Sequence, residues 1–288
     1  MAATRHEIRR LLNRARRNPL LISGGAIVLF FLVIGLLAPV VADHDPLQQN
    51  LDMRMAPGFW AGNASHPLGT DELGRDILSR LVHGTRISLL MGLVCVGIVL
   101  VMGGSLGMLC GYFGGAIDAI VMRLVDILLS FPYILLAIAI MAVFGQGLVN
   151  AVVAVAIVLT PSAARVTRSV TLSLKSLQFV EAAKSYGASA RRIMMRHLLP
   201  NLVPHLIVYG ALSMGETILS IAALGFLGLG VQPPTPEWGA MINTGKDMLI
   251  LGKWWISAFP GIAITLAVTG FALLGDGLRD FLDPRMRS

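Results

Sequence analysis

Long apolar runs separated by polar stretches are the dominant pattern along this 288-residue chain. Because a bilayer core of about 30 Å needs roughly 20 apolar residues per helix, each such run predicts a membrane-spanning helix. Six runs are present, at residues 20–42, 87–113, 127–144, 148–164, 202–230 and 256–275. The fourth is short, so five or seven spans stay open. The pattern predicts an all-α membrane protein with six transmembrane helices.

The first run differs from a removable signal peptide. It is 23 residues long, whereas the apolar core of a signal peptide has about 7–15 residues and precedes a small-residue cleavage site. We expect residues 1–19 to form an N-terminal tail and residues 20–42 the first transmembrane helix. Pro39 is expected to kink or fray the end of this helix.

The polar segment 43–86 contains the stretch "HPLGTDELGRDILSRL". Thr70 precedes the run "DELGRDILSRL", where Thr or Asp can cap a helix start. Beyond it, Ile77, Leu78, Leu81 and Val82 fall on one face of a helix. This spacing predicts an amphipathic helix lying along the outer membrane surface.

Charge orients these spans. The chain is 55% hydrophobic and only 14% charged, with a net charge of +7. Six arginines lie in residues 1–19 and seven Lys/Arg in residues 165–200, whereas residues 43–86 hold four Arg and six acids. Basic loops stay on the cytoplasmic side, so both termini and segment 165–200 are expected there. The excess of basic residues flanks the membrane spans, and orientation alone explains that placement. Nucleic-acid binding is therefore not favoured.

Cysteine, histidine and glycine spacing favours packing over chemistry. Cys95 and Cys110 are 15 residues apart, about 22 Å along one helix, too far for a disulfide. Small residues four apart let helices pack closely in lipid, as expected for the row Gly103, Gly107 and Gly111. No metal-ligand spacing stands out among the histidines, which are His6, His44, His66, His83, His197 and His205.

The segment "LSLKSLQFVEAAKSYGASARRIMMRHLLPNL" is basic and divides at Gly187. Residues 172–186 are expected to form one helix, which Gly187 ends because it tolerates positive φ. Ser189 can cap a second helix, and Pro200 closes that helix or begins the next span. A helix–turn–helix on the cytoplasmic face follows; by composition alone it is equally well a plain basic loop that fixes topology.

The order of residues in this segment resembles the signature loop of ABC importer permeases. The match consists of Glu181, Ala182, Ala183, Gly187, Leu199 and Pro200, with His197 where the consensus has Ile. The stretches "GYFGGAIDAIVMRLVDILLSFP", "AALGFLGLGVQPPTPEWGAMI" and "FPGIAITLAVTGFALLGDGLRDFLDPR" extend the likeness over residues 20–286. The chain is most similar to the second, C-type permease of dipeptide and oligopeptide importers in the peptide/nickel class.

The resemblance implies a type I ABC importer permease fold, with a core at 87–288 holding five transmembrane helices and a coupling loop at 165–200. It implies pairing with a homologous permease, two cytoplasmic ATPases, an extracytoplasmic binding protein and bacterial inner-membrane lipid. The expected ATPase-coupling residues are Glu181, Ala182, Ala183, Lys184, Gly187, Ala188, Ser189, Arg191, Arg192, Leu199 and Pro200.

No cofactor or catalytic residue is expected in this chain. The phosphate-binding pattern GxxxxGK[ST] occurs nowhere in the sequence, so ATP is not expected to bind by that route. ATP and Mg²⁺ are instead expected in the partner ATPases. No nucleophile–base arrangement and no metal site is predicted.

Candidate path and gate residues remain open between two interpretations. Glu216, with neighbouring Ser213 and Met214, contributes to a substrate path or is a helix-interface residue bonded to Ser213, Ser220 or a partner. The loop "GVQPPTPEWGAMI" is expected either to dock a binding protein or form an outer gate, or else to anchor at the membrane interface. Its candidate residues are Pro233, Pro234, Pro236 and Trp238. Trp254 and Trp255 are expected to be interfacial anchors.

Arg123 and Asp126, three residues apart, can pair on one helix face. Such a pair serves either coupling or interfacial anchoring.

The expected function is import of short peptides, with nickel complexes, glutathione or another small solute as alternatives. A proton-driven secondary transporter is the rival from another class, and it would need several buried ionisable residues. A scaffold without transport activity is the third interpretation.

Overall fold

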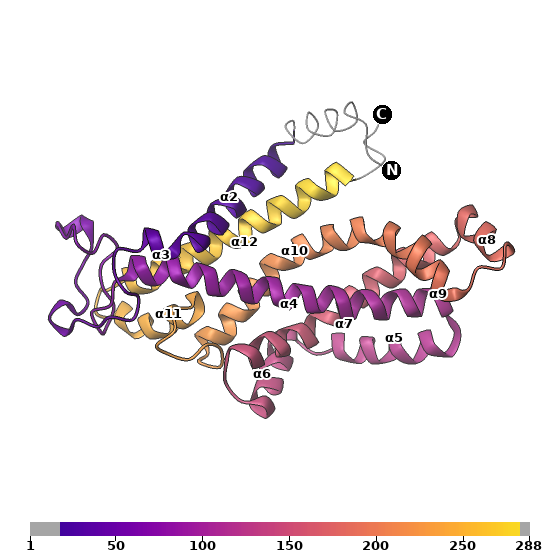
Figure 1. Cartoon of the computed structure of the whole chain (residues 1–288). Coiled ribbons are helices and arrows are strands. Elements are labelled where there is room, and N and C mark those ends of the chain that lie inside the picture. Colours follow the sequence, from indigo (N-terminus) through magenta and orange to yellow (C-terminus); the bar gives the residue numbers. More distant parts are fainter. Residues whose placement is uncertain (1–17, 283–288) are drawn as a thin grey trace.

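The computed structural model describes residues 18–282 and is helical, with no β-strand in that range (Figure 1). In this range, five helical stretches are long and apolar enough to cross a membrane. Four of them are α2 (Pro19–Leu36), α4 (Ile77–Phe113), α7 (Leu148–Lys175) and α12 (Trp255–Leu282), and the fifth includes α10 (Leu199–Phe226). Shorter helices are α3 (Ala38–Val41), α5 (Gly115–Leu129), α6 (Tyr133–Phe144), α8 (Gln178–Ser185), α9 (Ala190–Ile193) and α11 (Trp238–Gly245). One end of the bundle carries α8 and the other carries α11; we call them the α8 end and the α11 end.

The glycine row of α4 packs against α7, as the sequence predicts. A Cβ at Gly103 would lie 2.5 Å from the Ala163 Cβ, and one at Gly107 would lie 2.3 Å from the Ala164 carbonyl oxygen. Only a missing side chain permits this approach, because such separations are far below van der Waals contact. The two helices form the centre of the bundle, to which α10 adds a third member.

Helices α2 and α12 lie side by side along much of their length (Figure 1). Asn18 caps α2 by accepting from the Leu20 and Leu21 amides, and its side-chain amide donates to the Gly277 carbonyl. The pair is thereby joined at the ends of the two helices. The predicted weakening near Pro39 is confirmed, since α2 ends at Leu36 and α3 follows. Of the expected tail, residues 1–17 lie outside the described residues.

The expected third span is not a continuous helix. Helices α5 and α6 meet at a 95° bend across a short break. Pro132 explains the break, because proline pushes its preceding residue, Phe131, out of helical conformation. The chain still passes from the α8 end to the α11 end here, since Gly147 donates to the carbonyl of Leu229 beyond the far end of α10. Six crossings are therefore reached only by counting this bent pair as one span.

The predicted outer amphipathic helix is wrong, as is the boundary at residue 87. Asp76, not Thr70, caps α4 by accepting from the Ser79 amide at 2.7 Å. Helix α4 then runs unbroken for 37 residues from Ile77 into the expected second span. The apolar residues at its start pack inward: Ile77 is 1% exposed and Val82 is 4% exposed.

A buried ionic network explains why α4 starts earlier. The Arg75 guanidinium donates to the Asp71 carboxylate at 2.7 Å, and Arg80 lies 3.4 Å from the same carboxylate. Arg80 also donates to the carbonyls of Pro46 and Pro234. The network fastens the loop before α4 and the loop before α11 onto the first turns of α4.

The expectation that the cysteines do not bridge is confirmed. Cys95 and Cys110 are both buried free thiols within α4. They fill space in the core, as small apolar residues do.

Gly107→Ala is predicted to destabilise the protein by about 1–3 kcal/mol, because the added methyl group forces α4 away from α7. Gly97→Ala in the same helix is the matched control, since a Cβ there meets nothing within 4 Å. Thermal unfolding in detergent measures the difference. Equal melting temperatures for the two variants would contradict the close-packing role of the row.

Candidate functional site

The basic segment at the α8 end, residues 176–198, holds most of the expected coupling residues and is called the coupling segment below. The predicted helix over residues 172–186 is wrong. Helix α7 extends to Lys175, well past the expected end of its span at residue 164, and α8 begins only at Gln178. The Ser176–Leu177 turn thus separates a long core helix from a short one that projects from the α8 end (Figure 1).

The turn after α8 has the geometry the sequence predicts. Gly187 has φ of +75°, a left-handed conformation that favours glycine at a helix end. The Ala188 amide donates to the Ala183 carbonyl at 3.0 Å, and the Gly187 amide to the Lys184 carbonyl at 2.9 Å. Ser189 then caps α9 by accepting from the Arg192 amide.

Pro200 does not close the second predicted helix; it lies at the start of the next span, the alternative that the sequence left open. Helix α9, a π turn at Met194–Leu198 and α10 form one apolar rod over Ala190–Phe226, 37 residues long. Pro200 lies in the first turn of α10, where its missing amide hydrogen costs little. A movement at α9 is therefore applied directly to a membrane-spanning helix.

A small core of its own holds the coupling segment rigid. Val180 and Leu198 are fully buried, Ile193 is 1% exposed, and Met108 and Leu202 complete the cluster. Half-buried residues packed against this cluster include the expected coupling residues Ala183, Ala188 and Leu199. Because α4, α8, α9 and α10 all contribute, the segment cannot turn independently of the bundle.

The outer face of the coupling segment is exposed and basic. Tyr186 at its tip is 91% exposed. Lys184 lies 5.9 Å from the Tyr112 ring centroid, and within residues 18–282 neither Arg191 nor Arg192 forms an ion pair. The exposed members of the expected coupling set are Glu181, Ala182, Lys184, Gly187, Ser189, Arg191, Arg192 and Pro200.

The three path candidates do not share one surface. Glu216 is exposed on α10, whereas Ser213 is 7% and Met214 is 5% exposed. The Glu216 carboxylate accepts no hydrogen bond from a described residue; the Ser220 hydroxyl donates to the Glu216 backbone carbonyl instead. A carboxylate on the open side of a membrane helix faces a partner or a water-filled cavity, because lipid would not solvate it.

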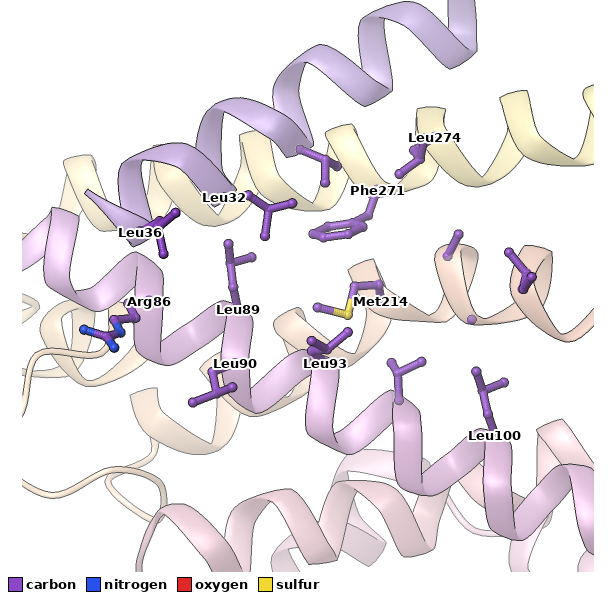
Figure 2. A pocket seen from close by; sticks show the side chains of 16 residues that line it. Leu32, Leu36, Arg86, Leu89, Leu90, Leu93, Leu100, Met214, Phe271 and Leu274 are labelled. Carbon is purple, nitrogen blue, oxygen red and sulfur yellow. The ribbon is translucent and has the colours of Figure 1, made fainter. Parts of the chain in front are cut away.

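Met214 lines an apolar groove between α2, α4, α10 and α12, shown in Figure 2. The groove has a volume of about 620 Å³, and Leu32, Leu89 and Phe271 are among its walls. Arg86 is the one polar lining residue, so the groove offers an apolar chain a surface but gives a peptide backbone few partners. Met214 and Glu216 therefore serve different surfaces.

The proline-rich loop at the α11 end divides into an exposed and a buried part. Pro233 and Pro234 are exposed, but Pro236 is buried and Trp238 is fully buried. The Trp238 indole donates to the Leu81 carbonyl at 3.2 Å and packs edge-on against Phe31. Trp238 is a core residue, and only the two exposed prolines remain available for docking.

The anchor expectation is wrong in the same way for Trp255, which is 4% exposed and whose indole donates to the Thr70 carbonyl. Trp254 is 47% exposed, and its role as an interfacial anchor stays a prediction. Asp126 pairs with Arg165, and not with Arg123 as its spacing suggests. A second pair, Arg168 with Asp118, joins the same two helices, α5 and α7.

Sequence reasoning missed Glu237, which lies in the loop before α11. Its carboxylate accepts from the Gly239 and Ala240 amides, both at 2.9 Å. Burial raises the pKa of this carboxyl, and the two backbone hydrogen bonds oppose that rise in part. The sequence gives little signal for this cap, because Ser, Thr, Asp and Asn are the preferred N-cap residues and Glu is not among them.

A family profile described as "binding-protein-dependent transport system inner membrane component" matches residues 103–288. The chain belongs to this family. A second profile, "N-terminal TM domain of oligopeptide transport permease C", matches residues 8–57. The protein is thus a multi-pass membrane permease, and the resemblance noted in the sequence is confirmed.

Curated relatives span nearly the whole permease. The di/tripeptide transport system permease protein DppC of Pseudomonas aeruginosa is 47% identical over 92% of this chain and 88% of its own. The probable D,D-dipeptide transport system permease protein DdpC of Escherichia coli is 43% identical, covering 98% and 93%. The glutathione transport system permease protein GsiD of Pectobacterium atrosepticum is 43% identical, covering 96% and 90%.

The fold has a solved counterpart. A chain of the MetNI methionine ABC transporter, in an inward-facing conformation, superposes with a TM-score of 0.58 over 71% of this chain and 97% of its own, at 21% identity. The permease therefore has the expected type I importer fold.

Ile193→Ala is predicted to loosen the coupling segment, since truncating a fully buried Ile or Leu costs about 2–5 kcal/mol. Met195→Ala is the control, because Met195 is 54% exposed. Hydrogen exchange of the amides in α8 and α9 should accelerate in the first variant and stay near wild type in the second. Unchanged exchange in Ile193→Ala would show that the small core does not rigidify the segment.

Proposed function

We propose that this permease forms one half of the translocation path of an ATP-driven importer of short peptides. The observation that carries the proposal is the continuity of Ala190–Phe226, which places an exposed basic surface and Glu216 on one rigid rod. A motor bound to the coupling segment can move the path-facing side of α10 without any intervening flexible joint. Alternating access then follows from a shift between two positions of this rod.

The coupling segment is proposed to bind a cytoplasmic ATPase, with one such surface on each of two permeases. Exposed Arg191 and Arg192 favour an acidic receiving groove, because complementary charge fixes register and speeds encounter. Half-buried Ala183 and Ala188 support the exposed face from behind. ATP and Mg²⁺ belong to the ATPases in this proposal, and the permease performs no bond chemistry.

Glu216 is proposed to face the path that this permease lines together with a homologous subunit. Its carboxylate has no partner among residues 18–282, and a peptide carries a cationic terminal amine that would pair with it. The chain's relatives are named for di/tripeptides, D,D-dipeptides and glutathione, all short and peptide-like. Short peptides are therefore the proposed substrate class.

The α8 end is proposed to be cytoplasmic, because its excess of Lys and Arg obeys the positive-inside rule. Both termini would then lie in the cytoplasm of a bacterium, and the α11 end would face outward. Exposed Pro233 and Pro234 on that side are proposed to contribute to docking of a substrate-binding protein or to an outer gate.

Reversing the charge of the coupling segment tests the first part of the proposal. Arg191→Glu combined with Arg192→Glu should weaken ATPase binding at least about tenfold, because like charges at an interface cost several kcal/mol. Arg279→Glu is the matched control, since Arg279 is an exposed arginine in the last turn of α12 and lies outside the coupling segment. Co-purification and substrate-stimulated ATP hydrolysis in proteoliposomes measure the effect; equal losses in both variants would oppose the proposal.

Glu216→Gln separates the proposed importer from a proton-driven transporter. Loss of one charge-assisted bond of about 1.5 kcal/mol should raise the KM for peptide uptake about tenfold while uptake stays dependent on ATP. Leu219→Ala, on the same exposed face of α10, should leave the KM near wild type. Uptake driven by a proton gradient without ATP, and abolished in Glu216→Gln, would support the rival transporter.

A further inference from the structure

Three potential metal ligands gather near the α11 end, although they are scattered in the sequence. His44 follows α3, His66 lies in the loop before α4, and Asp76 caps α4. Within the described residues, one ligand atom from each can be chosen so that all lie within 4.8 Å of one another. The spacing of the histidines in the sequence does not predict this site, because it cannot show that the loop folds back and brings His44 next to His66 and Asp76.

The distances within this cluster suit a chelate. His66 Nδ1 and Asp76 Oδ1 are 3.0 Å apart. Ligands placed about 2.0–2.1 Å from a tetrahedral ion are about 3.3 Å apart, so a small adjustment seats an ion between them. The other Asp76 oxygen accepts from the Ser79 amide at 2.7 Å, which fixes the carboxylate with Oδ1 toward the two imidazoles. An ion would replace the direct contact between His66 Nδ1 and Asp76 Oδ1.

The second imidazole has no other structural role. The His44 ring makes no hydrogen bond to any residue in 18–282, yet its centroid lies 4.7 Å from that of His66. Stacking of two imidazoles alone leaves the ring nitrogens of His44 without a protein partner. A cation bound by both rings would supply such a partner.

The backbone around the ligands is already fixed. The Pro46 carbonyl, two residues from His44, accepts from buried Arg80. The His66 amide donates to Asn63 Oδ1 at 3.2 Å, and the His66 carbonyl accepts from Gly69. The His66 side chain is 11% exposed and that of Asp76 is 2% exposed, while half-buried His44 leaves the cluster open to the surface.

We propose that His44, His66 and Asp76 bind a divalent transition-metal ion of the Zn²⁺ class. Two imidazoles and one carboxylate, with water in a fourth position, are a typical Zn²⁺ ligand set. Ca²⁺ and Mg²⁺ prefer oxygen ligands and are excluded by the same chemistry. The bound ion would cross-link the loop after α3 to the start of α4, independently of the transported solute.

The test uses the full-length permease in nanodiscs, without a polyhistidine tag, titrated with ZnCl₂ by calorimetry. We expect the wild type to bind one more Zn²⁺ than His44→Ala, or to bind it at least about tenfold more tightly. His205→Ala is the control, because His205 is an exposed histidine at the far end of the bundle. Mg²⁺ should give no such difference.

A second measurement needs no variant. Zn²⁺ should protect His44 and His66 from modification by diethyl pyrocarbonate, read by peptide mass spectrometry, and should leave His205 reactive. Identical Zn²⁺ titrations for wild type and His44→Ala, or unprotected His44 at saturating Zn²⁺, would falsify the proposal and leave a plain hydrogen bond between His66 and Asp76.

Discussion

The close approach of α4 to α7 is the constraint on which the other parts depend. With methyl groups in place of its glycine hydrogens, α4 would lie farther from α7, and the helices packed on both would lose their common surface. At one end α4 carries the buried Asp71–Arg75–Arg80 network, and at the other its Met108 enters the core beneath the coupling segment. One unbroken helix therefore connects the loops at the α11 end to the surface where force is proposed to enter.

Hydropathy located the membrane helices well but not their ends or breaks. The apolar run that predicts the second span begins ten residues after α4 does, because a buried ionic network and an Asp76 cap stabilise polar first turns. Hydropathy could not show that Pro132 divides the third apolar run, although the proline itself is visible in the sequence. Where helices end depends on caps and tertiary partners that a hydropathy window averages away.

Some of the functional residues could be located from the sequence, and others depended on tertiary contacts. The coupling set follows from an ordered motif, and the left-handed Gly187 and the cap by Ser189 lie where that motif indicates. Side-chain direction is not readable from a single apolar helix, so Met214 and Ser213 could not be separated from Glu216. Trp238 resembled an interfacial residue only because its neighbours are polar and proline-rich. Its burial depends on α4, where its partner Leu81 lies 157 residues away in the chain.

The π turn at Met194–Leu198 has a consequence for length changes in this protein. A π turn holds one residue more than the regular helix it interrupts. Losing a single residue there restores ordinary i→i−4 bonding and leaves the two flanks in their mutual orientation. The same loss elsewhere in Ala190–Phe226 rotates one flank by about 100° against the other. Shortening is therefore tolerated at this one turn, and elsewhere along the rod it would point α9 and Glu216 in new relative directions.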